Sequence, residues 1–287
     1  MKNQILTIFT PTYNRCNKLK RLYQSLSNQT CKRFIWIIVD DGSNDDTRFF
    51  IQKIKKEANF EIRYYWQINS GKSMAHNLGV RLTTTELFTC VDSDDYLSED
   101  AVEVLIKKWS QRTAQDVGIL ARREVTKVKN STKDGIHTTL RDSNKKYGIK
   151  GDTMLIFKTE ILKKYKFPYF QNEKFVPENY LYDLIDKEGT LLFFDKVLYF
   201  GEYLEDGYTN NMAKLIKKNP YGYLAYIKQR LSFDKTMTDT IADTIRYIAI
   251  SYVIEKEDVI KDSINPILTI LCLPLGKLFF IKRYKNI

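Results

Sequence analysis

The sequence predicts an α/β fold: a mixed, mostly parallel sheet with helices on both faces. Apolar runs of strand length alternate with amphipathic segments of helix length. The runs are continuously apolar, as in strands buried on both faces. Each of three runs is followed by a polar cluster, PTYNR, DDGS or DSDD. Since ligands bind beyond the carboxyl ends of parallel strands, we expect these clusters to line one site.

The first half of the chain shows the alternation most clearly. Strands are predicted at 5–10, 34–40, 62–67 and 87–92, and helices at 17–28, at 45–57, from Gly71 onward and after Ser98. Ser98 is a suitable N-cap for the last of these helices. Residues 122–150 are poor in apolar side chains and predict exposed loops or edge strands. A core pattern resumes at 154–162, a late strand at 191–200 joins the same sheet, and helices follow from 213.

Composition limits the classes of partner. The formal net charge of +11 favours nucleic acid, a phosphorylated small molecule or an anionic membrane, although a lysine-rich surface alone also explains it. The four cysteines are scattered without a CxxC pair, which argues against a zinc site or a disulfide framework and fits a reducing cytosol. The N-terminal apolar run is too short for a signal peptide, and no run of 18 apolar residues occurs. A cytoplasmic protein is expected.

The most informative cluster is VDSDD at 91–95. Asp92, Asp94 and Asp95 place three carboxylates in four residues, and their mutual repulsion predicts a nearby cation. Helix capping explains one or two of them. A calcium-binding EF-hand does not fit, because Tyr96 and Leu97 stand where an oxygen ligand and glycine are needed. A divalent ion held by one or two carboxylates and by a substrate's phosphates fits better.

Two other clusters have weaker signals. GKS at 71–73 ends like a phosphate-binding Walker A loop, but the glycine required five residues earlier is Trp66. Lys72 is therefore either an anion contact at a helix N-terminus or a solvated lysine. VDDGS at 39–43 is either a polar turn or part of the site. His76 and His137 are the only histidines, and a lone histidine is more often structural.

Together these segments resemble the family 2 glycosyltransferases of the GT-A fold. The resemblance rests on PTYNR (11–15), VDDGS (39–43), SGKSMAHNLG (70–79) and VDSDD (91–95), in this order and at this spacing. NEKFVPENYLYDLI (172–185) and YFGEYLEDGYTNN (199–211) look like the acceptor half of bacterial members. The resemblance implies a catalytic domain over 1–212, with a nucleotide-sugar-binding half at 1–110 and an acceptor half at 111–212. A helical extension, which either associates with a membrane or packs as core, follows at 213–287.

The resemblance also implies roles for single residues. Asp94 binds Mn²⁺ or Mg²⁺, and Asp92 of the same DxD pair faces the ribose or donor sugar. Asp41 accepts a hydrogen bond from uracil. The family usually has Arg where this chain has His76, so Lys72 is expected to compensate beside the diphosphate. The remaining donor contacts implied are Pro11, Tyr13, Arg15, Ser93 and Asp95.

Inversion at the anomeric carbon requires a carboxylate base on the side opposite the leaving group. The family's acidic motif points to Glu178 in FVPEN, with Glu173 as the alternative. The segment EYLEDGYT (202–209) suits a loop that closes over the donor, in which Tyr203 either packs or stacks on a sugar. The apolar stretch 264–285 is either a core helix pair or an interfacial segment with Lys282, Arg283 and Lys285 toward anionic headgroups.

The resulting hypothesis is an inverting, metal-dependent hexosyl- or N-acetylhexosaminyltransferase. It uses a nucleotide sugar, UDP-linked, and a lipid-linked glycan acceptor in bacterial surface polysaccharide synthesis. It is expected at the cytoplasmic side of the cell membrane, in peripheral contact with it. One alternative is transfer to a protein or teichoic-acid acceptor. An alternative of another class is a nucleic-acid-binding protein, motivated by the positive charge, although it leaves the acidic strand ends unexplained.

Overall fold

The computed structural model describes residues 4–201, 211–233 and 235–285. The chain divides into two compact units. The sheet unit comprises Met1–Lys166 and Leu181–Glu202, and the helical unit comprises Phe167–Tyr180 and Tyr203–Ile287. The segment 167–180 thus groups with the C-terminal helices, while the functional division at residue 212 stays a prediction.

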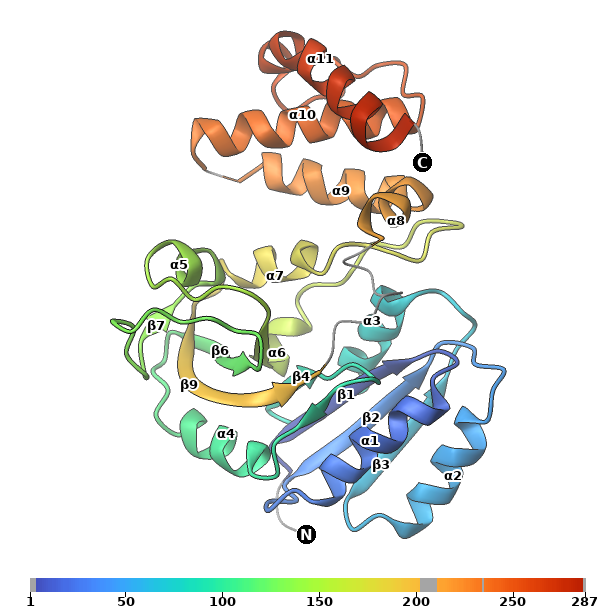
Figure 1. The fold of residues 1–287 in the computed structure, drawn as a ribbon, viewed down its shortest axis with the longest axis vertical. Helices are drawn as coiled ribbons and strands as arrows, with labels where there is room; N and C mark the ends of the chain where they lie inside the picture. Colours follow the sequence, from blue (N-terminus) through green and yellow to red (C-terminus); the bar gives the residue numbers. More distant parts are fainter. Residues whose placement is uncertain (1–3, 202–210, 234, 286–287) are drawn as a thin grey trace. The chain divides into compact units, whose positions relative to one another are not determined.

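The described elements alternate as expected through the first half (Figure 1). The strands are β1 (Leu6–Thr12), β2 (Phe34–Asp40), β3 (Glu61–Trp66), β4 (Leu87–Cys90), β5 (Tyr96–Leu97), β6 (Asp116–Arg123), β7 (His137–Thr138), β8 (Thr153–Lys158) and β9 (Thr190–Phe200). The helices are α1 (Cys16–Ser27), α2 (Thr47–Glu57), α3 (Lys72–Leu82), α4 (Ala101–Trp109), α5 (Leu140–Lys145), α6 (Thr159–Leu162), α7 (Asn179–Ile185), α8 (Met212–Lys218), α9 (Pro220–Leu231), α10 (Met237–Val253) and α11 (Pro266–Phe280), followed by a π-helical turn, η1 (Ile281–Lys285).

The described strands form one mixed sheet in the order β3-β2-β1-β4-β8-β6-β9-β5, with β7 paired to β9. The pairs β1–β2, β1–β4, β2–β3 and β6–β9 are parallel. The pairs that β8 makes with β4 and β6 are antiparallel, as are those that β5 and β7 make with β9. The predicted fold class, a mixed, mostly parallel sheet with helices on both faces and a C-terminal helical extension, is confirmed.

Alternation along β1 explains why helices cover both faces of the sheet. Ile8 belongs to the core cluster that includes the buried residues of α1, α2 and α4. The neighbouring Phe9 points the other way, toward α3, where a Cβ on Gly79 would lie 2.4 Å from its ring. Successive strand residues face opposite sides, so this pattern requires helices on each side.

Some expectations need correction. Ser98 is not the N-cap of α4. The N-cap is Asp100, because its carbonyl accepts the first intrahelical hydrogen bond, from Val104 N at 3.0 Å, while its side chain makes no capping bond. The polar stretch 122–150 holds β7 and the short helix α5 as well as loops. No helix among the described residues is long and apolar enough to span a membrane.

Candidate functional site

The three polar clusters meet at the carboxyl edge of the parallel strands, as predicted. β1 pairs in parallel with both β2 and β4, so the three strands end on the same side. The main chain of Asp41 donates to the Thr12 carbonyl at 2.8 Å, and Asn14 N donates to Ser43 Oγ at 2.9 Å. The segments after β1 and β2 are thus hydrogen-bonded to each other.

Each aspartate of the DSDD turn has a cation of its own. Asp94 pairs with Arg15 at 2.6 Å, Asp92 with Lys72 at 2.7 Å and Asp95 with Arg123 at 3.2 Å. The repulsion that predicted a cation is therefore offset by three side chains of the chain itself. Charge crowding alone no longer calls for a metal ion.

Two arginines of the α1 region hold the turn at Asp94. Arg15 precedes α1 and bonds the Asp94 carboxylate, while Arg21 within α1 donates from Nη2 to the Asp94 carbonyl. The Arg21 guanidinium also lies 4.8 Å from the ring centroid of Tyr96, a cation–π contact. The side chain of Asp94 is thus held from the residue before α1, and its main chain from within α1.

Asp95 lies in a buried network at the end of β9. Tyr199 donates from Oη to Asp95 Oδ2 at 2.6 Å and accepts from Asp92 N at 3.0 Å. The guanidinium of Arg123 stacks 4.2 Å from the Tyr199 ring. Burial, with the charges of Asp92 and Asp94, raises the pKa of Asp95 to about 6, although Tyr199 and Arg123 act in the opposite direction. Asp95 therefore joins the acidic turn to Tyr199 of β9 and Arg123 of β6.

Lys72 stands at the first position of α3 and reaches both oxygens of Asp92, at 2.7 and 3.0 Å. Burial acts to raise the pKa of Asp92. The positive charges nearby outweigh burial and hold this pKa below its usual value, and the largest contribution is that of Lys72, followed by Arg123 and Arg15. Asp92 is therefore an anion at neutral pH. The helix N-terminus and the ammonium together make a positive locus beside the turn.

Asp41 binds the loop that leads into α3. Its Oδ1 accepts from Gln67 Nε2 at 2.6 Å and Ser70 N at 2.8 Å, and its Oδ2 accepts from Gly71 N at 2.8 Å. Gly71 has φ of 90°, a conformation that favours glycine. The carboxylate thus orders the N-terminus of α3. Its predicted contact with uracil stays a prediction.

His76 is 6% exposed and lies edge-on against the rings of Phe9 and Phe88, at centroid distances of 5.6 and 5.3 Å. Burial, and then the charge of Lys72, lowers the pKa of His76 to about 3, so the imidazole is neutral. This placement packs α3 onto β1 and β4. A donor contact by His76 stays a prediction.

The other predicted donor contacts differ in exposure. Tyr13 is 46% exposed just after β1, at the carboxyl edge of the sheet. Pro11 is buried within β1, paired with Val39 of β2, and Ser93 is buried within the turn. Of these three side chains, Tyr13 is the one most open to a ligand.

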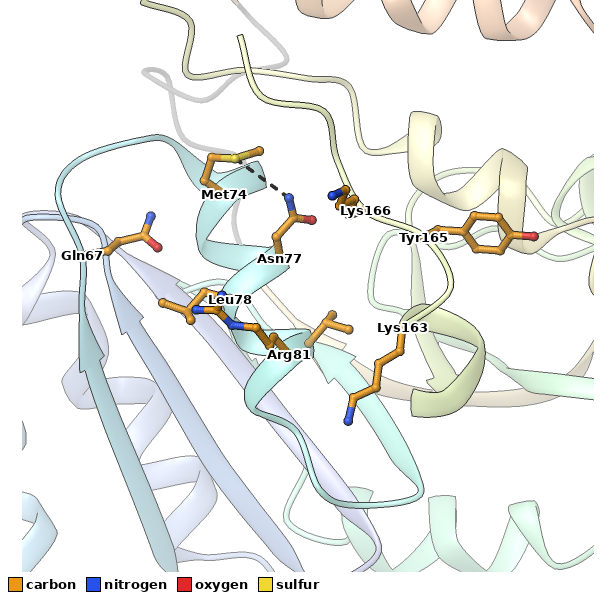
Figure 2. A pocket seen from close by; sticks show the side chains of 9 residues that line it. Gln67, Met74, Asn77, Leu78, Arg81, Lys163, Tyr165 and Lys166 are labelled. Carbon is orange, nitrogen blue, oxygen red and sulfur yellow. Dashed lines mark hydrogen bonds between the residues drawn. The ribbon is translucent and has the colours of Figure 1, made fainter. Parts of the chain in front are cut away.

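A pocket of about 760 Å³ lies between α3 and the segment that follows α6 (Figure 2). Met74, Asn77, Leu78 and Arg81 of α3 form one wall, and the segment after α6 forms another. Its remaining lining residues are Gln67, Val80, Lys163, Tyr165 and Lys166. Gln67 also bonds Asp41, so the pocket adjoins the α3 loop.

The predicted bases lie in the helical unit. Glu178 is exposed immediately before α7. Glu173 accepts from Tyr221 N at 2.8 Å and Gly222 N at 2.7 Å, so its carboxylate caps the first turn of α9. The predicted loop 202–209, with Tyr203, lies outside the described residues.

The donor set at the turn fits one kind of metal site. The described residues contain no group of three or more His, Cys, Asp or Glu side chains that would hold a metal by themselves. Asp94 offers carboxylate oxygens, one of which Arg15 occupies. Mg²⁺ and Mn²⁺ are commonly held by one or two carboxylates together with substrate phosphates, which needs no protein cage. The residues fit an ion shared with a diphosphate.

Residues 7–166 match the model of glycosyl transferase family 2. The chain belongs to this family. It is 27% identical over 256 residues to a GalNAc(5)-diNAcBac-PP-undecaprenol beta-1,3-glucosyltransferase of Campylobacter jejuni, covering 85% of this chain and 81% of that protein. It spans only 15% to 17% of four other glycosyltransferases that it matches over about a hundred residues.

Solved structures share the family's GT-A fold. Staphylococcus aureus TarS 1-349 in complex with UDP-GlcNAc superposes with a TM-score of 0.61 at 17% identity, covering 98% of this chain and 89% of that one. The mannosyltransferase PcManGT of Pyrobaculum calidifontis, in complex with GDP-Man and Mn²⁺, gives 0.60 at 12% identity, covering 99% and 89%. At these identities the likeness establishes the fold.

Three residues that contact the acidic turn were not predicted from the sequence: Arg21, Arg123 and Tyr199. Arg123 ends β6 and Tyr199 lies near the end of β9, more than a hundred residues after the α1 arginines. The sequence did contain one indication of them. The crowded carboxylates of VDSDD call for nearby positive charge, but they do not indicate which basic residues supply it.

Proposed function

We propose that this family 2 enzyme is an inverting, metal-dependent glycosyltransferase that moves a sugar from a UDP-linked donor to a lipid-linked glycan. The observation that carries the donor side is the meeting of Asp41, Lys72 and the Asp92–Asp95 turn at one sheet edge. The acceptor is inferred from the Campylobacter relative, whose name specifies an undecaprenol-linked substrate and whose length this chain largely spans. We also propose that the enzyme acts at the cytoplasmic side of the cell membrane, in the synthesis of a bacterial surface polysaccharide.

The donor's charge would be shared among several groups. A divalent ion held by Asp94 and the diphosphate would act as a Lewis acid for the departing UDP. Lys72 and the N-terminus of α3 would stabilise the same diphosphate, and Arg15 lies within reach of it because it already bonds Asp94. Tyr13 would provide a stacking face for the uracil, and Asp41 would orient the α3 loop around it.

Glu178 is the proposed base that accepts the proton of the attacking hydroxyl. Glu173 is less suited, because both of its oxygens accept hydrogen bonds from the first turn of α9. Burial raises the pKa of Glu173, against the effect of those hydrogen bonds. Glu178 is solvent-exposed immediately before α7, as a base that contacts an incoming acceptor must be.

A nucleotide-sugar screen tests the proposal. UDP release should require Mn²⁺ or Mg²⁺ and a lipid-linked acceptor, with inversion seen by NMR of the product. Asp94→Ala and Glu178→Ala should each abolish transfer, whereas Glu257→Ala, an exposed glutamate elsewhere in the helical unit, should keep it. Turnover that is indifferent to metal and to Asp94→Ala would exclude the metal assignment. Full turnover by Glu178→Ala would exclude that base.

A further inference from the structure

The C-terminal helix α11 does more than complete a core, because several of its large apolar side chains are exposed to solvent. The residues that it buries against its own unit are Thr269, Cys272 and Gly276, which are small. α11 packs on α10 (Figure 1). Gly276 permits this close packing, since a Cβ there would lie 2.4 Å from Ile248. Leu268, Leu273, Phe279 and Phe280 pack, partly buried, against the same core, whereas the other large apolar residues of α11 are exposed.

The exposed residues form what we call the outer face of α11: Ile267, Ile270, Leu271, Leu275 and Leu278 of the helix, with Ile281 at the start of η1. Their exposed fractions run from 38% for Ile281 to 74% for Ile267. At 100° per residue they span an arc of about 140°, opposite the buried positions. Single exposed apolar side chains are ordinary, but a contiguous stripe marks an interaction site.

The charges around the outer face identify what covers it. Residues 264–287 contain Lys277, Lys282, Arg283 and Lys285 and no Asp or Glu. A second copy of the chain would bring these same cations against each other, because a twofold interface pairs a patch with itself. An anionic bilayer instead accepts the apolar side chains and attracts the cations.

The length of α11 decides whether the helix would span a bilayer or lie on its surface. It has 15 residues with Pro274 inside it, and no described helix is long and apolar enough to span. We infer that the outer face of α11 is a docking surface for an anionic lipid bilayer, on which the helix lies in the plane of the headgroups. The inference deepens the proposed function, on which it rests for the membrane where a lipid-linked acceptor would be presented.

Flotation of the full chain with vesicles tests this without donor or acceptor, so its result does not depend on transferase activity. Wild type should float with vesicles of phosphatidylcholine and phosphatidylglycerol and much less with phosphatidylcholine alone. The double variant Leu271→Gln, Leu275→Gln should bind at least about tenfold more weakly, since two large apolar contacts are lost. Phe49→Gln, on α2 and 71% exposed, is the matched control and should bind like wild type.

Light scattering of the same proteins separates the outcomes. A wild-type dimer that does not float, and that Leu271→Gln, Leu275→Gln converts to a monomer, would overturn the inference in favour of a second copy. Equal flotation by wild type and the double variant would also overturn it. Vesicle binding without sugar transfer to any acceptor would uphold the docking surface and refute the proposed function.

Discussion

Arg15 donates a hydrogen bond from Nη1 to Oδ2 of Asp94 over 2.6 Å, joining residues 79 positions apart. The side chain expected beside the nucleotide and the side chain expected to bind a metal thus contact each other. The pair explains how the chain tolerates an acidic turn at its sheet edge, and it leaves Asp94 close to a cation that a diphosphate also attracts.

Asp94→Asn should separate folding from catalysis. The amide oxygen can still accept from Arg15, so the melting temperature should stay close to that of wild type. Loss of the negative charge should lower kcat/KM by roughly 10²–10³, the usual effect of removing one electrostatic group from a site. Asp142→Asn, which breaks an ion pair with Lys146 on α5, is the control and should keep full activity. Unchanged kcat/KM in Asp94→Asn would contradict the assignment.

Lys72→Met should weaken donor binding more than turnover. Without the ammonium, the carboxylate of Asp92 would lack its partner and repel the diphosphate. We expect the donor KM to rise by about tenfold, the equivalent of about 1.4 kcal/mol, with a smaller change in kcat. Steady-state kinetics at varied donor concentration measures this. Lys146→Met is the control, and an unaltered donor KM in Lys72→Met would count against a role for Lys72.

Tyr199→Phe should destabilise the fold at the site. The hydroxyl donates to Asp95 and accepts from Asp92 N, so its loss removes the partner of Asp92 N and leaves the buried side chain of Asp95 with Arg123 alone among the described residues. Such losses cost about 1–3 kcal/mol in the free energy of unfolding, measurable by urea titration. Tyr96→Phe, on the neighbouring β5, should change it by less than about 0.5 kcal/mol. Equal stability of the two variants would show that the network contributes little.

Asp243 makes the helical unit sensitive to acid. Its buried carboxylate accepts from Arg230 Nε at 2.9 Å, Lys235 Nζ at 2.5 Å and Arg246 Nη1 at 2.7 Å. Burial acts to raise the pKa of Asp243, but the hydrogen bonds and charges of Lys235 and Arg230 bring it below its usual value. Because the folded pKa is the lower one, the stabilisation is present above pH about 4 and is lost as pH falls through the folded pKa.

Asp243→Asn should therefore be less stable than wild type by about 3–5 kcal/mol at neutral pH, because three cations lose their counter-charge. The difference should shrink as pH falls below about 4, where the wild-type carboxylate becomes protonated. Urea unfolding at several pH values measures both. A difference that does not vary with pH would mean that the charge of Asp243 is not what stabilises the unit.

The position of the site was predictable because it follows from local patterns. Continuous apolar runs ending in PTYNR, VDDGS and VDSDD imply parallel strands whose carboxyl ends meet, and β1, β2 and β4 do so. The start of α4 was not predictable to the residue, since Ser98 and Asp100 are both good caps and only backbone hydrogen bonds chose between them.

The sequence by itself determined the α/β class, the family and the edge where the acidic turn lies, because hydrophobic periodicity and short motifs are local properties of the chain. The tertiary structure decided which side chains contact the aspartates of this turn. It brought Arg15, Lys72 and Arg123 to the three aspartates, and it turned the apolar side of α11 outward. Contacts between residues far apart in the chain depend on how strands and helices pack, which no local pattern records.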